Sequence, residues 1–109
     1  MKYYVMQIPS EKLEAMYPAS PFNYGMGNTG IPTVRRWVEG DLYKTVADVD
    51  AENLEEVFKV CNIGPEEKIQ VTEGAKPRSL SVGDIVVDRT DYNAYVVAPF
   101  GFDKLTETN

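Results

Sequence analysis

Two short apolar runs near the C-terminal end constrain the fold of this chain more than any other feature. Residues 85–87 (IVV) and 95–98 (YVVA) are separated by the polar connection 88–93 (DRTDYN). Runs of β-branched and aromatic residues bounded by polar turn residues are typical of strands, and two of them joined by a polar connection predict a β-hairpin. We therefore expect a sheet with this hairpin in its core.

The stretch just before the hairpin, residues 78–84 (RSLSVGD), raises the question of a reactive site. Gly83 can adopt backbone angles denied to other residues, and Asp84 can accept hydrogen bonds from neighbouring amides, which is typical of turns. A nucleophile at Ser79 or Ser81 would need a base, and the nearby Lys76 does not stand in the Ser-x-x-Lys order of lysine-activated serine enzymes. The stretch therefore predicts a turn that leads into a buried strand, with no catalytic residue.

Further strands are expected along the chain. Residues 2–8 are apolar on both alternating faces, which predicts a strand in the middle of a sheet. Residues 33–39 (TVRRWVE) and 42–49 (LYKTVADV) are also predicted as strands, separated by a turn at Gly40-Asp41, and residues 68–72 as a short strand.

Two helices are expected. A main helix over about 51–61 would have Asp50 as its N-cap, and its apolar residues at i, i+3, i+4 and i+7 would face the sheet: Leu54, Val57, Phe58 and Cys61. A short helix over about 10–17 would begin at Ser10 and end before Pro18.

The length of 109 residues suits one domain, 1–109. We expect an α+β fold, with a mostly antiparallel sheet of about five strands, the main helix about 51–61 and the short N-terminal helix about 10–17. A Gly/Pro-rich loop 19–32 and a polar C-terminal tail 106–109 complete the predicted organisation.

The charge of the chain disfavours some partners. Its formal net charge is −6, and most of the acidic residues lie between Glu39 and Glu67. Such a segment repels phosphate backbones and acidic lipids, which disfavours broad nucleic-acid binding and membrane binding. No apolar run approaches the roughly 20 residues that span a bilayer. The N-terminal residues do not resemble a secretory signal, and a single cysteine suits a reducing compartment, so a cytoplasmic location is expected.

Residues suited to catalysis or metal binding are scarce. The chain has no histidine, which excludes Ser-His-Asp and Cys-His systems and histidine-containing zinc sites within it. Cys61 falls on the apolar stripe of the main helix, where a core role is expected. Residues 25–30 spell G-x-G-x-x-G, but the residues after them look extended rather than helical, so these glycines are assigned a conformational role. We therefore expect a non-enzyme without metal or cofactor.

Three groups of residues could contact a partner. Arg35, Arg36 and Trp37 form one compact basic and aromatic cluster, which could stack on a base or grip a phosphate, or could pack into the core and pair with acids. Aromatic residues could instead anchor a protein interface: Tyr24, Trp37, Tyr92 and Tyr95. The glutamates of the main helix could attract a basic surface: Glu52, Glu55 and Glu56.

The C-terminal third also resembles a known family. RSLSVGDIVV at 78–87, followed by the tyrosine-valine strand and Gly101-Phe102, is similar to the R-S-x-S-V-[GS]-D-[VI]-[IV] … G-F signature of small phage- and plasmid-borne proteins, including the YodL-like domain. The preceding sequence from Tyr24 to Phe58 is also similar to phage-type members of this family, so the resemblance covers 24–105. It implies a mobile-element product working in a bacterial cytoplasm, and it transfers no activity and no site residue.

The leading hypothesis is therefore a non-enzymatic phage or mobile-element accessory protein. It would bind a host macromolecule, with a host protein favoured, and modulate or inhibit it through the acidic surface; host defence is one candidate target. The alternative is a nucleotide or nucleic-acid binding module that uses Arg35, Arg36 and Trp37. Whether the protein is a monomer or a homodimer stays open, as does mimicry of nucleic acid by the acidic segment.

Overall fold

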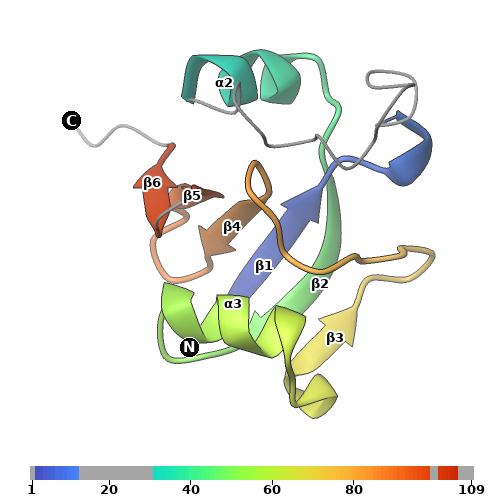
Figure 1. Cartoon of the computed structure of the whole chain (residues 1–109), viewed down its shortest axis with the longest axis vertical. Coiled ribbons are helices and arrows are strands. Elements are labelled where there is room, and N and C mark those ends of the chain that lie inside the picture. The colour runs from blue at the N-terminus through green and yellow to red at the C-terminus, as the bar shows by residue number, and fades with distance from the viewer. Residues whose placement is uncertain (1, 13–30, 99–100, 106–109) are drawn as a thin grey trace.

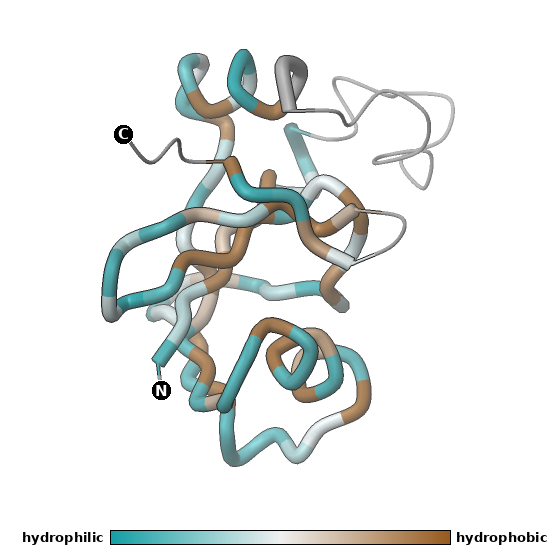
Figure 2. The backbone as a smooth tube through the Cα atoms, turned by 90° about the vertical axis from the view of Figure 1, so that its left-hand side faces the viewer, coloured by the Kyte–Doolittle hydropathy of each residue, from teal (hydrophilic) through white to brown (hydrophobic). Residues whose placement is uncertain are grey.

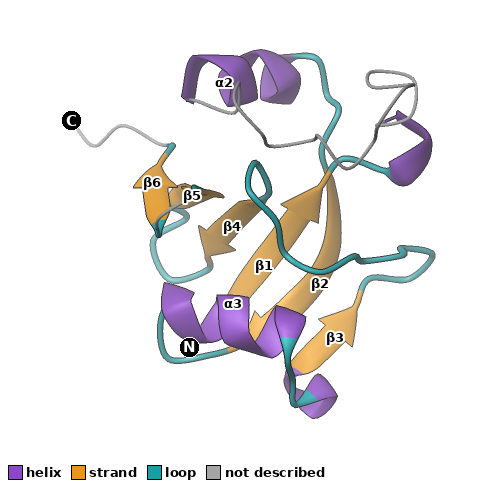
Figure 3. Cartoon of the chain, in the orientation of Figure 1, coloured by secondary structure: helices purple, strands orange, loops and turns teal. Residues whose placement is uncertain are grey.

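A six-stranded antiparallel sheet forms the centre of the protein, with strand order β3-β2-β1-β4-β5-β6 (Figures 1 and 3). The computed structural model describes residues 2–12, 31–98 and 101–105. Its strands are β1 (Lys2–Gln7), β2 (Lys44–Asp50), β3 (Ile69–Val71), β4 (Ile85–Asp88), β5 (Ala94–Val97) and β6 (Phe102–Lys104). Its helices are α2 (Ile31–Glu39), α3 (Leu54–Asn62) and the short 3-10 turn η2 (Glu66–Lys68). The predicted α+β class with a mostly antiparallel sheet is confirmed, with six strands in place of about five.

Strand β1 lies in the middle of the sheet, as its sequence predicts. It pairs antiparallel with β2 on one side and with β4 on the other. Tyr3 and Val5 are almost fully buried in the apolar layer under α3, whereas Tyr4 and Met6 pack into a second apolar layer on the opposite face. Both faces of β1 are therefore covered, which explains why its apolar residues do not alternate with polar ones.

Helix α3 covers one face of the sheet, but its start and its buried stripe differ from the prediction. The N-cap is Asn53, whose side chain accepts a hydrogen bond of 2.9 Å from the backbone N–H of Glu56. Asp50, the predicted cap, instead ends β2, opposite Lys2. Val57 and Val60 are its buried residues, and Leu54 and Cys61 are partly buried against the same layer, whereas Phe58 is 41% exposed and was wrongly assigned to the buried stripe.

Helix α2 corrects the prediction of a strand over 33–39. The segment is helical from Ile31, so the last two residues of the predicted loop 19–32 also belong to this helix. Val34 and Trp37 lie three residues apart, which places them on one side of a helix but on opposite sides of a strand. Both pack against the sheet face opposite α3, with Val34 fully buried. Helical packing therefore outweighed the strand propensity of this β-branched stretch.

The apolar residues form two layers, one on each face of the sheet. The layer under α3 includes Val5, Val49 and Val86, and the layer under α2 includes Ile8 and Val96. In Figure 2 hydrophobic segments run through the middle of the molecule and along parts of the helices on either side. None of the helices in the described ranges is long and apolar enough to cross a membrane.

The C-terminal hairpin is confirmed, and a strand that the sequence did not predict follows it. β4 and β5 pair as expected, with Val86 opposite Tyr95. Residues 102–104 then return as β6 alongside β5, and the backbone N–H of Leu105 donates to the carbonyl of Ala94 at 2.8 Å. The sheet therefore ends in a three-residue strand on each side, β3 and β6.

Residues 77–84, here called the strap, confirm the predicted turn. The carboxylate of Asp84 accepts from the backbone N–H of Ser81 at 2.9 Å, and Gly83 has a φ of +96°. The hydroxyl of Tyr43 donates to the carbonyl of Gly83 at 2.7 Å. Hydrogen bonds within the strap and to Tyr43 therefore fix the turn that leads into β4.

Gln7 of β1 fastens the strap to the sheet. Its side-chain amide donates to the carboxylate of Asp84 at 3.0 Å and to the carbonyls of Arg78 and Ser79 at 3.1 and 3.4 Å. Its oxygen accepts from the backbone N–H of Arg78 at 2.9 Å. Gln7 and Asp84 are each only 1% exposed, so this is a buried polar network.

Some predictions fall on residues outside the described ranges. Residues 10–12 are helical, as the short N-terminal helix requires, and residues 13–17 of that prediction lie outside. So do Tyr24, the glycine motif 25–30 and the tail 106–109.

Candidate functional site

A shallow groove of about 530 Å³ runs beside the N-terminal end of α3, where the helix meets β1, β5 and β6. We call it the acidic aromatic groove. Its lining combines two carboxylates with three aromatic rings: Tyr3, Asn53, Leu54, Glu55, Asp88, Tyr95, Gly101 and Phe102.

Strand pairing brings most of these residues together. Tyr3 lies directly opposite Asp88 in the β1–β4 pair, so the two side chains project from the same face of the sheet. Tyr95 and Phe102 come from β5 and β6, and Phe102 packs against the apolar layer under α3. Glu55 comes from the first turn of α3, which the Asn53 cap holds in place.

The groove is electrostatically negative. Burial, and then the nearby carboxylate of Asp88, raise the pKa of the Tyr3 phenol above its usual value. One oxygen of Asp88 accepts from the backbone N–H of Thr90 at 2.7 Å, which fixes the orientation of the carboxylate. Glu55 is solvent-exposed and forms no ion pair with another described residue. Carboxylates beside aromatic rings favour an ammonium or guanidinium group.

The three predicted glutamates do not act as one set. Glu52 and Glu55 are both exposed near the start of α3. Glu56 is partly buried and accepts a hydrogen bond of 3.3 Å from the ammonium of Lys68. Glu52 and Glu55 therefore remain available to a partner near the N-terminal end of α3, beside the groove.

The basic cluster lies on the other face of the sheet. Arg35 and Arg36 are exposed on α2, and Arg35 donates to the backbone carbonyl of Leu105 at 3.1 Å. Trp37 is partly buried against the apolar layer under α2. The structure therefore separates Arg35, Arg36 and Trp37 from the glutamates of α3.

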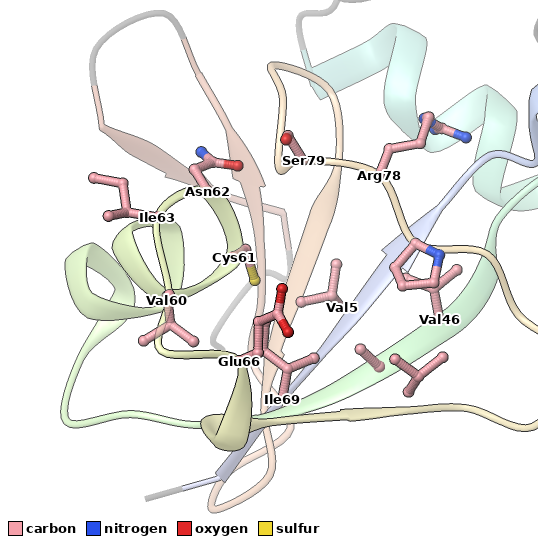
Figure 4. A pocket seen from close by; sticks show the side chains of 14 residues that line it. Val5, Val46, Val60, Cys61, Asn62, Ile63, Glu66, Ile69, Arg78 and Ser79 are labelled. Carbon is pink, nitrogen blue, oxygen red and sulfur yellow. The ribbon is translucent and has the colours of Figure 1, made fainter.

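A larger cavity, of about 600 Å³, lies between α3, the sheet and the strap (Figure 4). Its floor is apolar and includes Val5, Val46 and Ile69, and the sulfur of Cys61 lies at its wall. Burial, and then the charge of Asp84, raise the pKa of the Cys61 thiol to about 11. The thiol is therefore protonated near neutral pH and is a weak nucleophile.

The polar groups around this cavity are engaged in holding the strap. The side chain of Asn62 accepts from the backbone N–H of Leu80 at 2.7 Å and donates to its carbonyl at 3.2 Å. The hydroxyl of Ser81 donates to the carbonyl of Ser79 at 3.2 Å, not to a carboxylate that could act as its base. Among the residues that the structure describes, no cluster of His, Cys, Asp and Glu is suited to a metal ion.

Comparison of the chain with protein-family models, with curated proteins and with solved structures found no match. The argument for function therefore rests on the site itself.

Sequence reasoning did not find the acidic aromatic groove. Of its lining residues only Glu55 and Tyr95 were predicted contacts, and they were not predicted to lie together, because the lining comes from segments up to about a hundred residues apart in the chain. The sequence did contain one signal. Asp88 and Tyr95 stand at or near the turn of the predicted hairpin, and both lie on the same face of the sheet as Val86, because Tyr95 is opposite Val86 and Asp88 follows Val86 by two residues.

Proposed function

We propose that this protein is a non-enzymatic accessory protein of a phage or mobile element, which binds a basic surface on a host protein in the bacterial cytoplasm and modulates or inhibits that protein. The observation that carries the proposal is the acidic aromatic groove. A lysine or arginine side chain of the partner would insert between the carboxylates of Glu55 and Asp88 and lie against the rings of Tyr95 and Phe102.

The surroundings of the groove support a protein partner. Glu52 lies just before α3 and adds a second exposed carboxylate near the groove. Phe58, one turn along the helix from Glu55, is 41% exposed and offers apolar area beside the charges. Exposed charge pairs alone contribute little to affinity, whereas an aromatic side chain or an inserted arginine contributes much more. Carboxylates next to exposed aromatic surface therefore suit a specific contact with a partner protein better than charge attraction alone.

The test begins with capture of partners from bacterial lysate on the immobilised wild-type protein, followed by purification of the partner that is retained. Binding of that partner is then measured by calorimetry for the wild type, for Glu55→Lys and for Glu73→Lys. Glu73 is exposed in the turn after β3 and lies outside the groove, so its reversal changes the net charge equally.

We expect Glu55→Lys to weaken binding at least tenfold, which corresponds to about 1.4 kcal/mol, and Glu73→Lys to have less than a twofold effect. Binding of the wild type should also weaken as salt is added, because charge attraction is screened. Equal losses in both variants, or binding insensitive to salt, would refute the proposed site. Oligonucleotide binding at low salt that Arg35→Ala abolishes would instead favour the nucleic-acid alternative.

A further inference from the structure

A second enclosed space, of about 510 Å³, lies where the chain after β1, the start of β2 and the loop before the strap meet. It concentrates positive charge in an acidic protein. Lys44, Lys76 and Arg78 all line it, and Glu11 is the one carboxylate among the described residues that line it. We call it the basic cavity.

Arg78 directs its charge toward this cavity. In Figure 4 its side chain points away from the thiol of Cys61. Its Nη1 donates to the hydroxyl of Ser10, another lining residue, at 3.2 Å. Its Nη2 is buried and has no hydrogen-bond partner among the described residues. A buried guanidinium N–H without an acceptor is unfavourable, so Arg78, which lines the cavity, retains an unsatisfied donor group.

The two lysines are available to the same ligand. Lys76 is exposed and has no ion pair within the described ranges. Lys44 is 3.5 Å from the carboxylate of Asp41, but both side chains are more than half exposed, so solvent weakens this pair. Among the described residues, Glu11 in the lining and Asp41 beside Lys44 set two carboxylates against the three cations, which leaves a net positive site.

The rest of the lining suits a small organic molecule. Ile8, Pro9, Val46 and Ala75 supply apolar surface, while Thr45 adds a hydroxyl. The volume is within the usual range of about 300–1,000 Å³ for small-molecule sites, which combine an apolar lining with a few polar groups.

We propose that the basic cavity binds a small molecule through an oxyanion group, phosphate or carboxylate. The oxyanion accepts hydrogen bonds from Arg78 after a small rotation of its side chain and pairs with Lys76 and Lys44. Arginine and lysine are the side chains that bind these groups best. This site is separate from the acidic aromatic groove and does not depend on the function proposed for it.

The test is a titration of the ¹⁵N-labelled protein, followed by amide chemical shifts in NMR spectra. The probes are inorganic phosphate and acetate, with chloride at the same ionic strength as the control. We expect saturable shifts at amides around the cavity with at least one of the two oxyanions. The oxyanion that binds more tightly identifies whether the site prefers phosphate or carboxylate. Shifts that do not saturate, or that chloride reproduces, would overturn the proposal.

A matched pair of variants shows whether this cavity is the site. Lys76→Ala should weaken binding of the preferred oxyanion about tenfold, because one charge-assisted contact is lost. Lys59→Ala removes the same charge from the exposed surface of α3 and should change binding less than twofold. Equal effects in the two variants would mean that binding depends only on the net charge of the protein and would contradict the proposed site. Because Lys76 is exposed, the test does not depend on an Arg78 variant that alters the strap.

Discussion

Replacement of Gln7 by alanine tests the idea that one buried amide holds the strap onto the sheet. The side chain makes four contacts, but its two N–H hydrogens are shared among three acceptors, so the 3.4 Å contact to Ser79 adds little. Three effective hydrogen bonds remain, at about 1 kcal/mol net for each, and the bond to the Asp84 carboxylate is worth more because it is charge-assisted. We expect a loss of about 3–4 kcal/mol in the free energy of unfolding.

Urea unfolding followed by circular dichroism measures this loss. At a slope of about 1.5 kcal/mol per molar urea, the midpoint should fall by about 2–2.7 M. Gln70→Ala, on the exposed surface of β3, removes the same amide from the same sheet and should change the midpoint little. Gln7→Met keeps most of the side-chain volume, so its difference from Gln7→Ala separates the effect of the cavity from that of the lost hydrogen bonds.

The reasoning would be refuted by a Gln7→Ala protein that loses less than about 1 kcal/mol, or no more than Gln70→Ala. Such a result would mean that water replaces the amide and that the strap does not depend on Gln7.

Two further predictions concern the cavity in Figure 4. Because the pKa of Cys61 is raised to about 11 from 9.0, its thiolate fraction at pH 8 falls about a hundredfold. Alkylation by iodoacetamide, followed by mass spectrometry, should therefore be correspondingly slow and should accelerate up to about pH 11; a rate independent of pH would contradict this. Asn62→Ala removes both hydrogen bonds to the backbone of Leu80 and should cost about 2 kcal/mol in urea unfolding, and a neutral effect would show that solvent satisfies that backbone.

The sequence predicts well the elements whose structure is determined by neighbouring residues in the chain. β1, β4 and β5 have consecutive apolar residues because both of their faces are covered. The turn at 78–84 follows from Gly83 and Asp84, whose backbone and side-chain preferences act within a few residues.

The errors arise where distant contacts decide the structure. Val34, Trp37 and Val38 have high strand propensity, yet a helix places Val34 and Trp37 together against the sheet. The start at Ile31-Pro32 was the available sign, because proline is tolerated in the first turn of a helix. β6 has only three residues, and its extended form follows from pairing with β5.

The candidate site shows the same limit. Glu55 and Tyr95 could each be identified from the sequence as possible contacts, but their meeting with Tyr3, Asp88 and Phe102 in one groove could not. Tyr3 and Asp88 become neighbours only through the β1–β4 pairing, which joins opposite ends of the chain. The buried position of Gln7 was equally hidden, since a polar residue in a strand is ordinarily expected at the surface.

The central position of β1 has a consequence for how the protein is made. Its pairing with β2 needs only the first 50 residues, whereas its pairing with β4 needs residues 85–88. During synthesis from the N-terminus, the second edge of β1 therefore stays open until most of the chain has left the ribosome. Gln7 likewise gains its strap partners only once residues 78–84 have been made. A ribosome stalled before residue 85 would display an apolar strand with one unpaired edge, the form of the chain most exposed to aggregation and to chaperones.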